Sequence, residues 1–456
     1  MTESNEPTGW RVAVIGAGPA GCFTAGQLLR DPRVAEVAVI ERRLAPFGLI
    51  RYGVAPDHEP IRRVATVLAR TLADPRCRYF GGVDAGTVLD LGALRRHFHA
   101  VVLAAGASRH HPLGIPGEDL DGVMPAGSFV NWYNGHPEAA HPVDLSGPSV
   151  VIVGHGNVAL DTARMLLRDP GEFAATDMPP EVAEALARST VREVHLVGRR
   201  GPAQAAFGAT ELREVLGIPD LLVEIDPADL LLDPASAEEA ESPATARMLE
   251  AFRAVAHAPA RHTPHRVRLR FHFRRSPSAF RGEGHVREVV LTPNRLEGPA
   301  GQVRPVPLER AEERLPCSMA LLATGFVASA WASLPWDTGH ARHERGRVLE
   351  PEAGLGGVYA AGWIKRGARG LVGQTKADST ETAATLLDDL AGAEAADVSG
   401  SSGLEGLLKE AGVRWVSWPE WQRLDAEEIR RGAEAGKSRL RFESEEAMFR
   451  FLDGGK

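Results

Sequence analysis

Val12-Ala13-Val14-Ile15-Gly16-Ala17-Gly18-Pro19-Ala20-Gly21 is the stretch of this chain that decides its fold. The apolar residues before Gly16 predict a buried parallel strand, and the residues that follow, as far as Leu29, predict a helix. Gly16 permits a tight turn, Gly18 lets a pyrophosphate approach the backbone, and Gly21 lets the helix pack closely on the strand. The free N–H groups at the start of the helix would then face the phosphates. The stretch therefore predicts a dinucleotide-binding turn.

A second predicted strand supports this interpretation. Residues 37–40 are apolar, and the strand ends in Glu41, twenty residues after Gly21. At this spacing a carboxylate can accept hydrogen bonds from the ribose of an adenosine. A glycine turn alone is a weak signal, whereas strand, turn, helix, strand and terminal carboxylate together form a specific one.

The same pattern occurs again in the middle of the chain. Residues 149–153 predict another buried strand, and Gly154-His155-Gly156-Asn157-Val158-Ala159 forms a second glycine turn, with alanine in the last position. An amphipathic helix is expected over residues 160–167. The next predicted strand, residues 191–197, ends in Gly198-Arg199-Arg200-Gly201. We therefore expect two dinucleotide-binding units.

The two strand ends predict different ligands. Glu41 suits a free ribose 2′-hydroxyl, whereas Arg199 and Arg200 can bind a 2′-phosphate with charge-assisted hydrogen bonds. The first unit should accordingly hold FAD and the second NADP. The alternative is that the two arginines are ordinary solvated charges after a strand.

Composition limits the other possibilities. The chain has 456 residues, a hydrophobic fraction of 44% and a net charge of −8, so its overall charge does not point to nucleic acid. Its three cysteines, Cys22, Cys77 and Cys317, are far apart and form no CxxC pair, which argues against a zinc site, an iron–sulfur site or a dithiol relay. We expect no bound metal. Neither a leader peptide nor a run of 18 apolar residues is evident, so we expect a cytoplasmic protein without membrane insertion.

One further segment is strongly basic. Residues 261–287 carry eight arginines and one acid, and apolar side chains alternate with Arg268, Arg270, His272 and Arg274. The period of two predicts a strand with one wet face. This face is either simply solvated, which we favour, or a surface for an anionic partner.

Several motifs together give the chain its family resemblance. With both glycine turns it resembles the adrenodoxin-reductase type of ferredoxin–NADP reductase over essentially its whole length. The motifs that carry the resemblance are Phe47-Gly48-Leu49-Ile50-Arg51-Tyr52-Gly53-Val54-Ala55-Pro56-Asp57-His58, Gly156-Asn157-Val158-Ala159-Leu160-Asp161, Val197-Gly198-Arg199-Arg200-Gly201-Pro202, Glu211-Leu212-Arg213-Glu214 and Ala361-Gly362-Trp363-Ile364-Lys365-Arg366-Gly367.

The resemblance implies an α/β fold with two Rossmann-like dinucleotide-binding domains. The NADP domain (109–325) would be inserted into a discontinuous FAD domain (1–108 and 326–456), which ends in a C-terminal appendage. FAD would contact Ala17, Glu41, Leu49, Val83, Trp363, Gly370, Leu371 and Val372, in addition to the turn at Gly16, Gly18 and Gly21. NADP would contact His155, Gly156, Asn157, Val158, Arg199, Arg200 and Glu211, with Gly370 reached by both cofactors. His58 and Glu214 match family positions near the nicotinamide and the flavin edge, and His155 stands where the family has Asn or Gly.

The expected activity is hydride transfer from NADPH to FAD, followed by single-electron transfer to a ferredoxin-type iron–sulfur protein. His58 and Glu214 are the candidate catalytic residues, as modulators of proton or charge balance; the alternative is that they are structural. One rival function is a flavin disulfide reductase, which the lack of a CxxC pair disfavours. The other rival is an NADPH-docking flavoprotein subunit of a larger electron-transfer complex.

Overall fold

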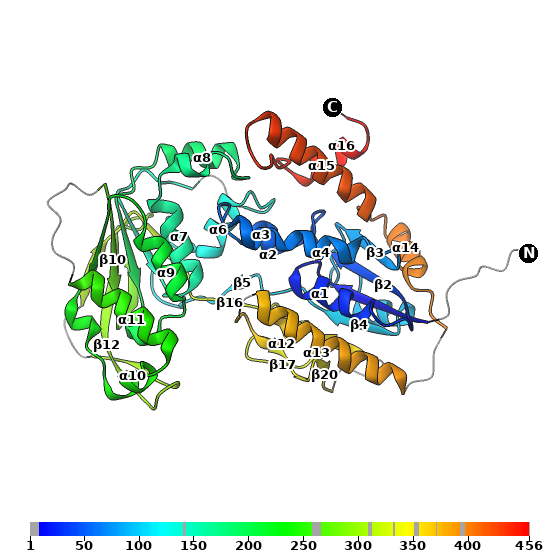
Figure 1. Cartoon of the computed structure of the whole chain (residues 1–456), viewed down its shortest axis with the longest axis horizontal. Helices are drawn as coiled ribbons and strands as arrows, with labels where there is room; N and C mark the ends of the chain where they lie inside the picture. The colour runs from blue at the N-terminus through cyan, green and yellow to red at the C-terminus, as the bar shows by residue number, and fades with distance from the viewer. Residues whose placement is uncertain are drawn as a thin grey trace, which may run out of the picture. The chain divides into compact units, whose positions relative to one another are not determined.

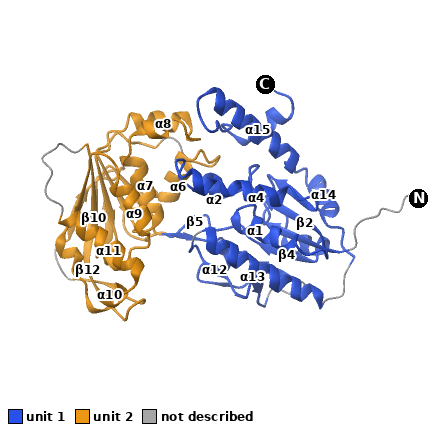
Figure 2. Cartoon of the chain, in the orientation of Figure 1, with its two compact units in different colours: residues 1–111, 325–456 blue, residues 112–324 orange. Residues whose placement is uncertain are grey.

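The computed structural model describes residues 9–139, 143–257, 266–308, 312–331, 333–350, 355–370, 372–392 and 397–455. Two compact units are present (Figure 2). Unit 1 comprises residues 1–111 and 325–456, and unit 2 comprises residues 112–324. The chain leaves and re-enters unit 1 along two short antiparallel strands, β5 (Arg109–His110) and β16 (Phe326–Val327). The chain thus passes through unit 1 twice and unit 2 once.

Unit 1 is built on a mostly parallel sheet (Figure 1). Within the described residues its strand order is β19-β20-β21-β4-β1-β2-β3, and the five strands from β21 to β3 are parallel. The strands are β1 (Trp10–Ile15), β2 (Val34–Glu41), β3 (Cys77–Gly81), β4 (Ala100–Leu103), β19 (His343–Glu344), β20 (Arg347–Val348) and β21 (Val358–Ala360). A separate pair is formed by β17 (Trp336–Asp337) and β18 (His340–Ala341).

Both faces of the unit 1 sheet are buried, as the apolar strands predicted. Along β1, Val12 and Val14 belong to one hydrophobic cluster and Ala13 and Ile15 to the other. Helices α1 and α13 lie side by side on the first face (Figure 1). The helices of unit 1 are α1 (Pro19–Leu28), α2 (Leu49–Tyr52), α3 (Glu59–Arg62), α4 (Val64–Leu72), α5 (Leu91–His97), α12 (Trp363–Arg366), α13 (Val372–Ala391), α14 (Ser401–Glu410), α15 (Trp418–Glu434) and α16 (Glu445–Leu452).

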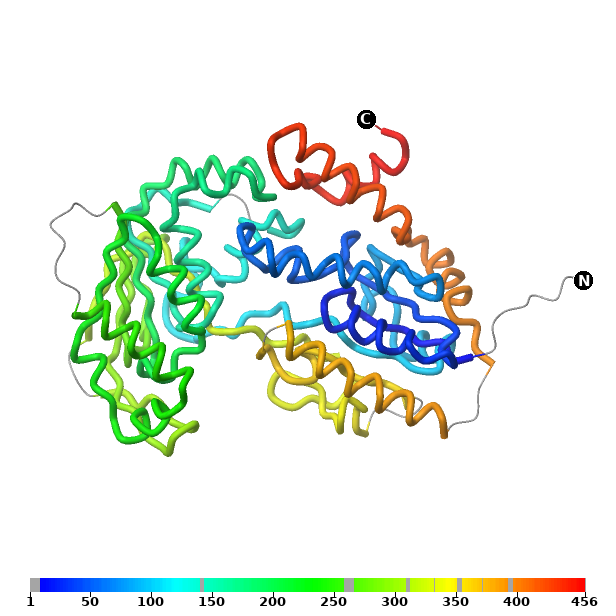
Figure 3. Tube along the Cα trace, in the orientation of Figure 1, coloured from blue at the N-terminus to red at the C-terminus, as the bar shows by residue number. Residues whose placement is uncertain are grey.

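The C-terminal appendage, from α14 to α16, lies along the rest of unit 1 (Figure 3). Its Trp415, Trp418 and Trp421 rings contact Phe80, Tyr79 and Phe47, respectively. A buried ion pair accompanies these contacts: Arg51 Nη2 on α2 lies 2.7 Å from Glu428 Oε1 on α15, and the Glu428 side chain has no exposed surface. The appendage therefore holds the segment that carries the motif at residues 47–58.

Unit 2 has a second parallel sheet, of order β6-β15-β7-β8-β10-β9 in the described part of the chain. An antiparallel sheet of β11, β12, β13 and β14 contributes to a cluster on one side of it, and helices cover the other. The strands are β6 (Val123–Pro125), β7 (Ser149–Val153), β8 (Glu193–Val197), β9 (Leu221–Ile225), β10 (Val267–His272), β11 (Arg275–Arg281), β12 (Glu288–Glu297), β13 (Arg304–Pro307), β14 (Glu313–Pro316) and β15 (Met319–Leu322). The helices are α6 (Ala126–Tyr133), α7 (Asn157–Leu167), α8 (Pro180–Ala187), α9 (Ala209–Leu216), α10 (Pro234–Glu239) and α11 (Pro243–Ala256).

The predicted α/β fold class is confirmed, with local corrections. The sequence predicts one helix over residues 60–72, but the structure divides it at Arg63 into α3 and α4. The sequence predicts an ordered loop over residues 42–58, and this segment contains the short helix α2. The sequence also predicts a surface excursion over residues 229–247, which contains α10 and the start of α11. Among the described residues, no helix is both long enough and apolar enough to span a membrane.

Candidate functional site

The first glycine turn has the geometry that a dinucleotide requires. Gly16 has φ +107°, and a Cβ there would lie 2.5 Å from the Ala104 carbonyl oxygen. A Cβ on Gly21 would lie 1.8 Å from the Gly16 oxygen, so helix α1 contacts the turn directly. At Gly18, the residue before α1, the nearest neighbour of such a Cβ is the Gly48 Cα at 3.9 Å. The turn is thus closely packed at Gly16 and Gly21, and it is open at Gly18, where a phosphate would approach.

Glu41 ties the end of β2 to this turn. Its Oε2 accepts a hydrogen bond from Ala17 N at 2.7 Å, and its Oε1 accepts one from Arg43 N at 3.1 Å. Burial raises the pKa of the Glu41 carboxyl, against the effect of these two donors. Each carboxylate oxygen keeps a further lone pair, so Glu41 can also accept ribose hydroxyls.

Two predicted FAD contacts lie at buried positions. Ala17 is 0% exposed and Val83 is 1% exposed. The Ala17 N–H donates to Glu41, and the Ala17 oxygen accepts from Phe47 N at 2.8 Å. The contacts of Ala17 and Val83 with FAD stay predictions. Leu49, at the start of α2, is 42% exposed and offers surface for the contact predicted for it.

The C-terminal part of the predicted FAD site follows β21. Trp363 begins α12 and stacks on Phe326, with ring centroids 6.1 Å apart. Gly370 is exposed, Val372 begins α13, and Leu371 lies outside the described residues. Because β21, β4, β1 and β2 are parallel neighbours, their carboxyl ends share one sheet edge. That edge carries the first glycine turn, Glu41 and the Trp363 turn, which is where open α/β sheets bind ligands.

The second glycine turn joins β7 to α7. Gly154 has φ +137°, and Gly156 immediately precedes the helix, where an added Cβ would meet nothing within 4 Å. Asn157 and Val158 begin α7, so their N–H groups are among the free donors of a helix start. Asn157 Oδ1 is buried and has no hydrogen-bond partner among the described residues. The free N–H groups of this helix start fit a phosphate-containing ligand.

The His155 side chain packs against β8 and against Phe273. Its Nε2 donates to the Leu196 carbonyl at 3.1 Å, and its ring packs on Phe273 with centroids 4.7 Å apart. Burial lowers the pKa of His155 to about 4, so the ring is neutral at pH 7. The contact with NADP predicted for His155 is therefore left to its backbone.

Arg199 and Arg200 follow β8, the parallel neighbour of β7, and both are exposed. Their carbonyls are fixed: Asn294 Nδ2 donates to the Arg199 oxygen at 3.0 Å, and Arg274 N donates to the Arg200 oxygen at 2.9 Å. Arg199 forms no ion pair among the described residues. The backbone of both arginines is thus held by hydrogen bonds, at the same sheet edge that carries the Gly154 turn.

The predicted catalytic residues lie in different units. His58 precedes α3 in unit 1 and is half-buried, with its N–H bonded to the Ala55 oxygen at 3.0 Å. Glu214 lies on α9 in unit 2 and is exposed, whereas Glu211, in the first turn of the same helix, is half-buried. Their roles remain predictions.

The basic strand is confirmed, and acids neutralise it. On β10, Arg270 Nε lies 3.0 Å from Glu193 on β8 and also pairs with Glu224 on β9. Arg268 lies 3.7 Å from Glu193 and 3.8 Å from Glu224. These carboxylates flank the arginines on both sides, which disfavours a surface for an anionic partner.

The cysteines offer no redox pair. Cys22, Cys77 and Cys317 are free and buried. Burial raises the pKa of Cys22 and raises those of Cys77 and Cys317 to about 12. A buried thiol with a raised pKa is a poor nucleophile, which argues against dithiol chemistry.

Comparison with known proteins gives consistent results. A family model described as pyridine nucleotide-disulphide oxidoreductase matches residues 10–209. The mitochondrial NADPH:adrenodoxin oxidoreductases of Arabidopsis thaliana and Bos taurus are 39% and 38% identical to the chain; the alignments cover 94% and 97% of this chain and 92% of each relative. The structure of Mycobacterium tuberculosis FprA in complex with NADPH is 34% identical, with a TM-score of 0.90 over 98% of this chain and 100% of that one.

Proposed function

The chain belongs to the family of NADPH:adrenodoxin and NADPH:ferredoxin oxidoreductases, and from this premise we propose that unit 1 holds FAD and unit 2 holds NADP(H). The protein is an oxidoreductase that takes electrons from NADPH through FAD to a ferredoxin-type iron–sulfur protein. The observation that carries the division of cofactors is the contrast between the strand ends, a fixed carboxylate in unit 1 and two exposed guanidinium groups in unit 2.

Unit 1 fits FAD. Gly18 and the N-terminus of α1 would face the pyrophosphate, Glu41 would accept the adenosine ribose hydroxyls, and Leu49, Trp363 and Val372 would border the ligand. When bound, FAD accepts a hydride and returns electrons one at a time. The task of the chain is to hold the flavin and to exclude water from it, and among the described residues it offers no thiol pair for further chemistry.

Unit 2 fits NADP(H). Gly156, Asn157 and Val158 would bind the pyrophosphate at the start of α7, and Arg199 with Arg200 would bind the 2′-phosphate. Glu211 lies on α9 at the same unit's surface, and the resemblance assigns it to the bound coenzyme. His58 and Glu214 would hold or move protons near the reacting rings. The alternative of a docking subunit is less well supported, because the alignments span over nine-tenths of both this chain and the independent reductases.

One experiment tests this function directly. The purified protein should show a flavin spectrum with one FAD per chain, and anaerobic addition of NADPH should bleach it. A small ferredoxin added next should restore the colour. A protein that binds FMN or no flavin, or that NADPH cannot bleach, would overturn the proposal. Bleaching without transfer to any ferredoxin would favour the docking subunit.

The cytoplasmic location predicted above remains a proposal. The plant and bovine relatives are named as mitochondrial, and the names of the mycobacterial relatives carry no such word. Fractionation of the source cells, with the protein followed by antibody, would decide between the two locations.

A further inference from the structure

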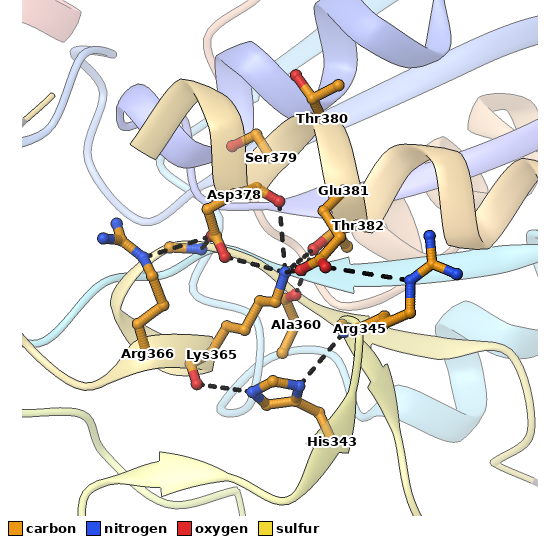
Figure 4. Close-up of polar contacts among 12 residues, drawn as sticks. His343, Arg345, Ala360, Lys365, Arg366, Asp378, Ser379, Thr380, Glu381 and Thr382 are labelled. Carbon is orange, nitrogen blue, oxygen red and sulfur yellow. Dashed lines mark hydrogen bonds and ion pairs between the residues drawn. The ribbon is translucent and has the colours of Figure 1, made fainter. Parts of the chain in front are cut away.

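A cluster of charged side chains surrounds Lys365, close to the turn that begins at Gly362. The Lys365 ammonium on α12 is 2.9 Å from Asp378 Oδ1 and 2.7 Å from Glu381 Oε2, both on α13 (Figure 4). It also donates to Thr382 Oγ1 at 3.1 Å. The side chains of Lys365 and Asp378 are only 3% and 6% exposed, whereas that of Glu381 is 46% exposed. Lys365 and Asp378 thus form the buried centre of the cluster, and Glu381 lies at its rim.

Asp378 connects this centre to the backbone of the turn. Its Oδ2 accepts a hydrogen bond from Gly362 N at 2.6 Å, while its Oδ1 faces Lys365. Gly362 has φ +71°, and a Cβ there would lie 2.5 Å from the Ala20 Cβ at the start of α1. The turn therefore touches the first helix turn after Gly16-Ala17-Gly18, and the carboxylate fixes it in that place.

Neighbouring contacts link these helices to one another and to strands β19 and β21. Ser379, the residue after Asp378, donates from Oγ to the Ala20 oxygen at 3.1 Å. Thr382 Oγ1 donates to the Ala360 oxygen at the end of β21 at 3.0 Å. On the other side of α12, the Lys365 oxygen accepts from His343 Nε2 at 2.9 Å, and Gly346 N donates to His343 Nδ1 at 3.3 Å (Figure 4). The helices α1, α12 and α13 are thus connected by one polar network, which centres on Lys365, Asp378 and Ser379.

Burying a charge pair is costly, and well-packed apolar side chains often stabilise a fold better. A pair of this kind is therefore weak evidence for stability, and its role is sought in the elements that it joins. Each element that it joins carries residues assigned to FAD above: the glycine turn before α1, Trp363 at the start of α12, and Val372 at the start of α13. The polar network therefore fixes the three segments assigned to FAD relative to one another.

We propose that Asp378, held by Lys365, is a positioning residue for FAD: it fixes the Gly362–Trp363 turn against the N-terminus of α1 and sets the charge behind the flavin. This inference rests on the proposed function, because it concerns the turn assigned to FAD. Asp378 acts through the backbone of the turn and through its charge, without touching the cofactor itself.

The test compares three variants in FAD titrations of the apoprotein and in flavin midpoint potentials of the reloaded protein. Asp378→Asn should raise the FAD Kd about tenfold or more, since an amide cannot accept from Gly362 and also satisfy Lys365. It should also raise the midpoint potential, because the buried cluster loses one negative charge and Lys365 keeps only the half-exposed Glu381 as a counter-charge. Asp378→Glu keeps the charge but displaces the carboxylate, so it should raise the Kd while leaving the potential close to that of the wild type.

Asp389→Asn is the matched control on the same helix. Asp389 anchors α13 by an ion pair with Arg347 and by accepting from the Tyr359 hydroxyl at 2.7 Å, and neither of these contacts reaches the Gly362 turn. This variant should lower the melting temperature of the apoprotein but leave the FAD Kd and the potential unchanged.

Each result decides the proposal. Equal loss of FAD affinity in Asp378→Asn and Asp389→Asn would show that α13 needs only anchoring and would overturn it. Wild-type Kd and potential in Asp378→Asn would also overturn it. If Asp378→Asn does not fold, Asp378→Glu decides: wild-type affinity there would mean that any nearby carboxylate suffices. A wild-type chain that takes up no FAD would overturn the proposed function as well, whereas failure of the variants alone leaves that function intact.

Discussion

The two glycine turns make the same backbone hydrogen bond to the neighbouring strand. They differ in which side chain links turn and strand: a strand side chain in unit 1 and a turn side chain in unit 2. In unit 1, Gly16 N donates to the Ile40 oxygen at 2.7 Å, and in unit 2, Gly154 N donates to the Val197 oxygen at 2.8 Å. By this register Glu41 corresponds to Gly198, and Ala17 corresponds to His155. In unit 1 the strand's carboxylate reaches the turn at Ala17 N, whereas in unit 2 the turn's imidazole reaches the strand at the Leu196 oxygen.

This difference is the basis for the proposal that the two units hold different dinucleotides. A Cβ on Gly198 would lie 2.2 Å from His155 Nδ1, so the imidazole fills the space beside the strand end where unit 1 has a carboxylate. Because the neutral His155 ring links the turn to the strand, unit 2 needs no carboxylate at the position that Glu41 occupies in unit 1. The next two residues, Arg199 and Arg200, can then present positive charge without a carboxylate at the strand end. The position of the acid therefore distinguishes a 2′-hydroxyl site from a 2′-phosphate site.

The largest expected effect comes from removing the positive charge in unit 2. Arg199→Ala with Arg200→Ala should raise the NADPH KM ~10²–10³-fold, since charge-assisted hydrogen bonds contribute about 1.5–3 kcal/mol each and the exposure of both guanidinium groups keeps each bond near the lower value. The NADH kinetics should barely change, because NADH has no 2′-phosphate. Steady-state rates with both coenzymes and a dye acceptor measure this.

Arg192→Ala is the control for that double variant. Arg192 is an exposed arginine just before β8, at the end opposite to Arg199, and it donates to the Val191 oxygen at 2.7 Å. Its loss should leave the coenzyme preference unchanged. Equal loss of NADPH and NADH activity in the double variant would show that the two arginines support the fold, and the contrast between the strand ends would then not select the coenzyme.

Removing the charge of Glu41 should have a smaller effect, and on the other cofactor. Glu41→Gln leaves one of two backbone donors, Ala17 N or Arg43 N, facing an amide NH₂ group. We expect the FAD Kd to rise about 10–100-fold, equivalent to the ~1.5–3 kcal/mol of a hydrogen bond to a charged group. The NADPH KM of the FAD-saturated protein should stay near its wild-type value. Titration of the apoprotein with FAD measures the change.

Glu36→Gln separates this effect from damage to the strand. Glu36 lies on β2 as well, accepts from Ser401 N at 2.9 Å and pairs with Arg11 at 3.9 Å. Its substitution should lower the melting temperature without weakening FAD binding. If both variants lose FAD to the same extent, Glu41 only stabilises β2.

The strand ends were predictable from the sequence because their chemistry is local. Glycine spacing, apolar runs and the residue that ends each strand lie within a few tens of residues of one another. The local pattern was therefore enough to place Gly16, Glu41 and Arg199 at the ends of strands, where the structure has them. One local signal was overlooked: Asp233 before Pro234 caps α10, accepting from Ser236 N at 3.0 Å, within a segment expected to be a surface excursion.

Side-chain direction could not be predicted in the same way. The His155 ring turns inward because Phe271 and Phe273, from a segment far along the chain, form an apolar surface beneath it. The pairing of Arg51 with Glu428 joins residues 377 positions apart. Lys365 belongs to a motif visible in the sequence, but nothing in the sequence marks Asp378 as its partner. Such contacts depend on tertiary packing, which spacing along the chain does not encode.

The smallest expected effect concerns the hydrogen bond from His155 to the Leu196 oxygen in unit 2, which is tested by the pH dependence of stability. Burial lowers the pKa of His155 from 6.5 to about 4, so below pH 6.5 the unfolded chain binds a proton that the folded unit excludes. The contribution of His155 to stability is therefore complete above pH 6.5 and is lost as the pH falls toward 4. At pH 5.5 the loss should be about 1 kcal/mol.

His155→Gln isolates this contribution. An amide can still donate to the Leu196 oxygen but does not titrate in this range, so the variant should unfold like the wild type at pH 7.5 and lose about 1 kcal/mol less on acidification to pH 5.5. Hydrogen exchange of β7 and β8 at the two pH values measures this within unit 2. The neighbouring His272, whose pKa burial lowers to about 3, keeps part of the acid sensitivity in the variant. If the variant and the wild type lose the same stability, the His155 ring is not held neutral and buried, and the two turns do not differ in the way proposed.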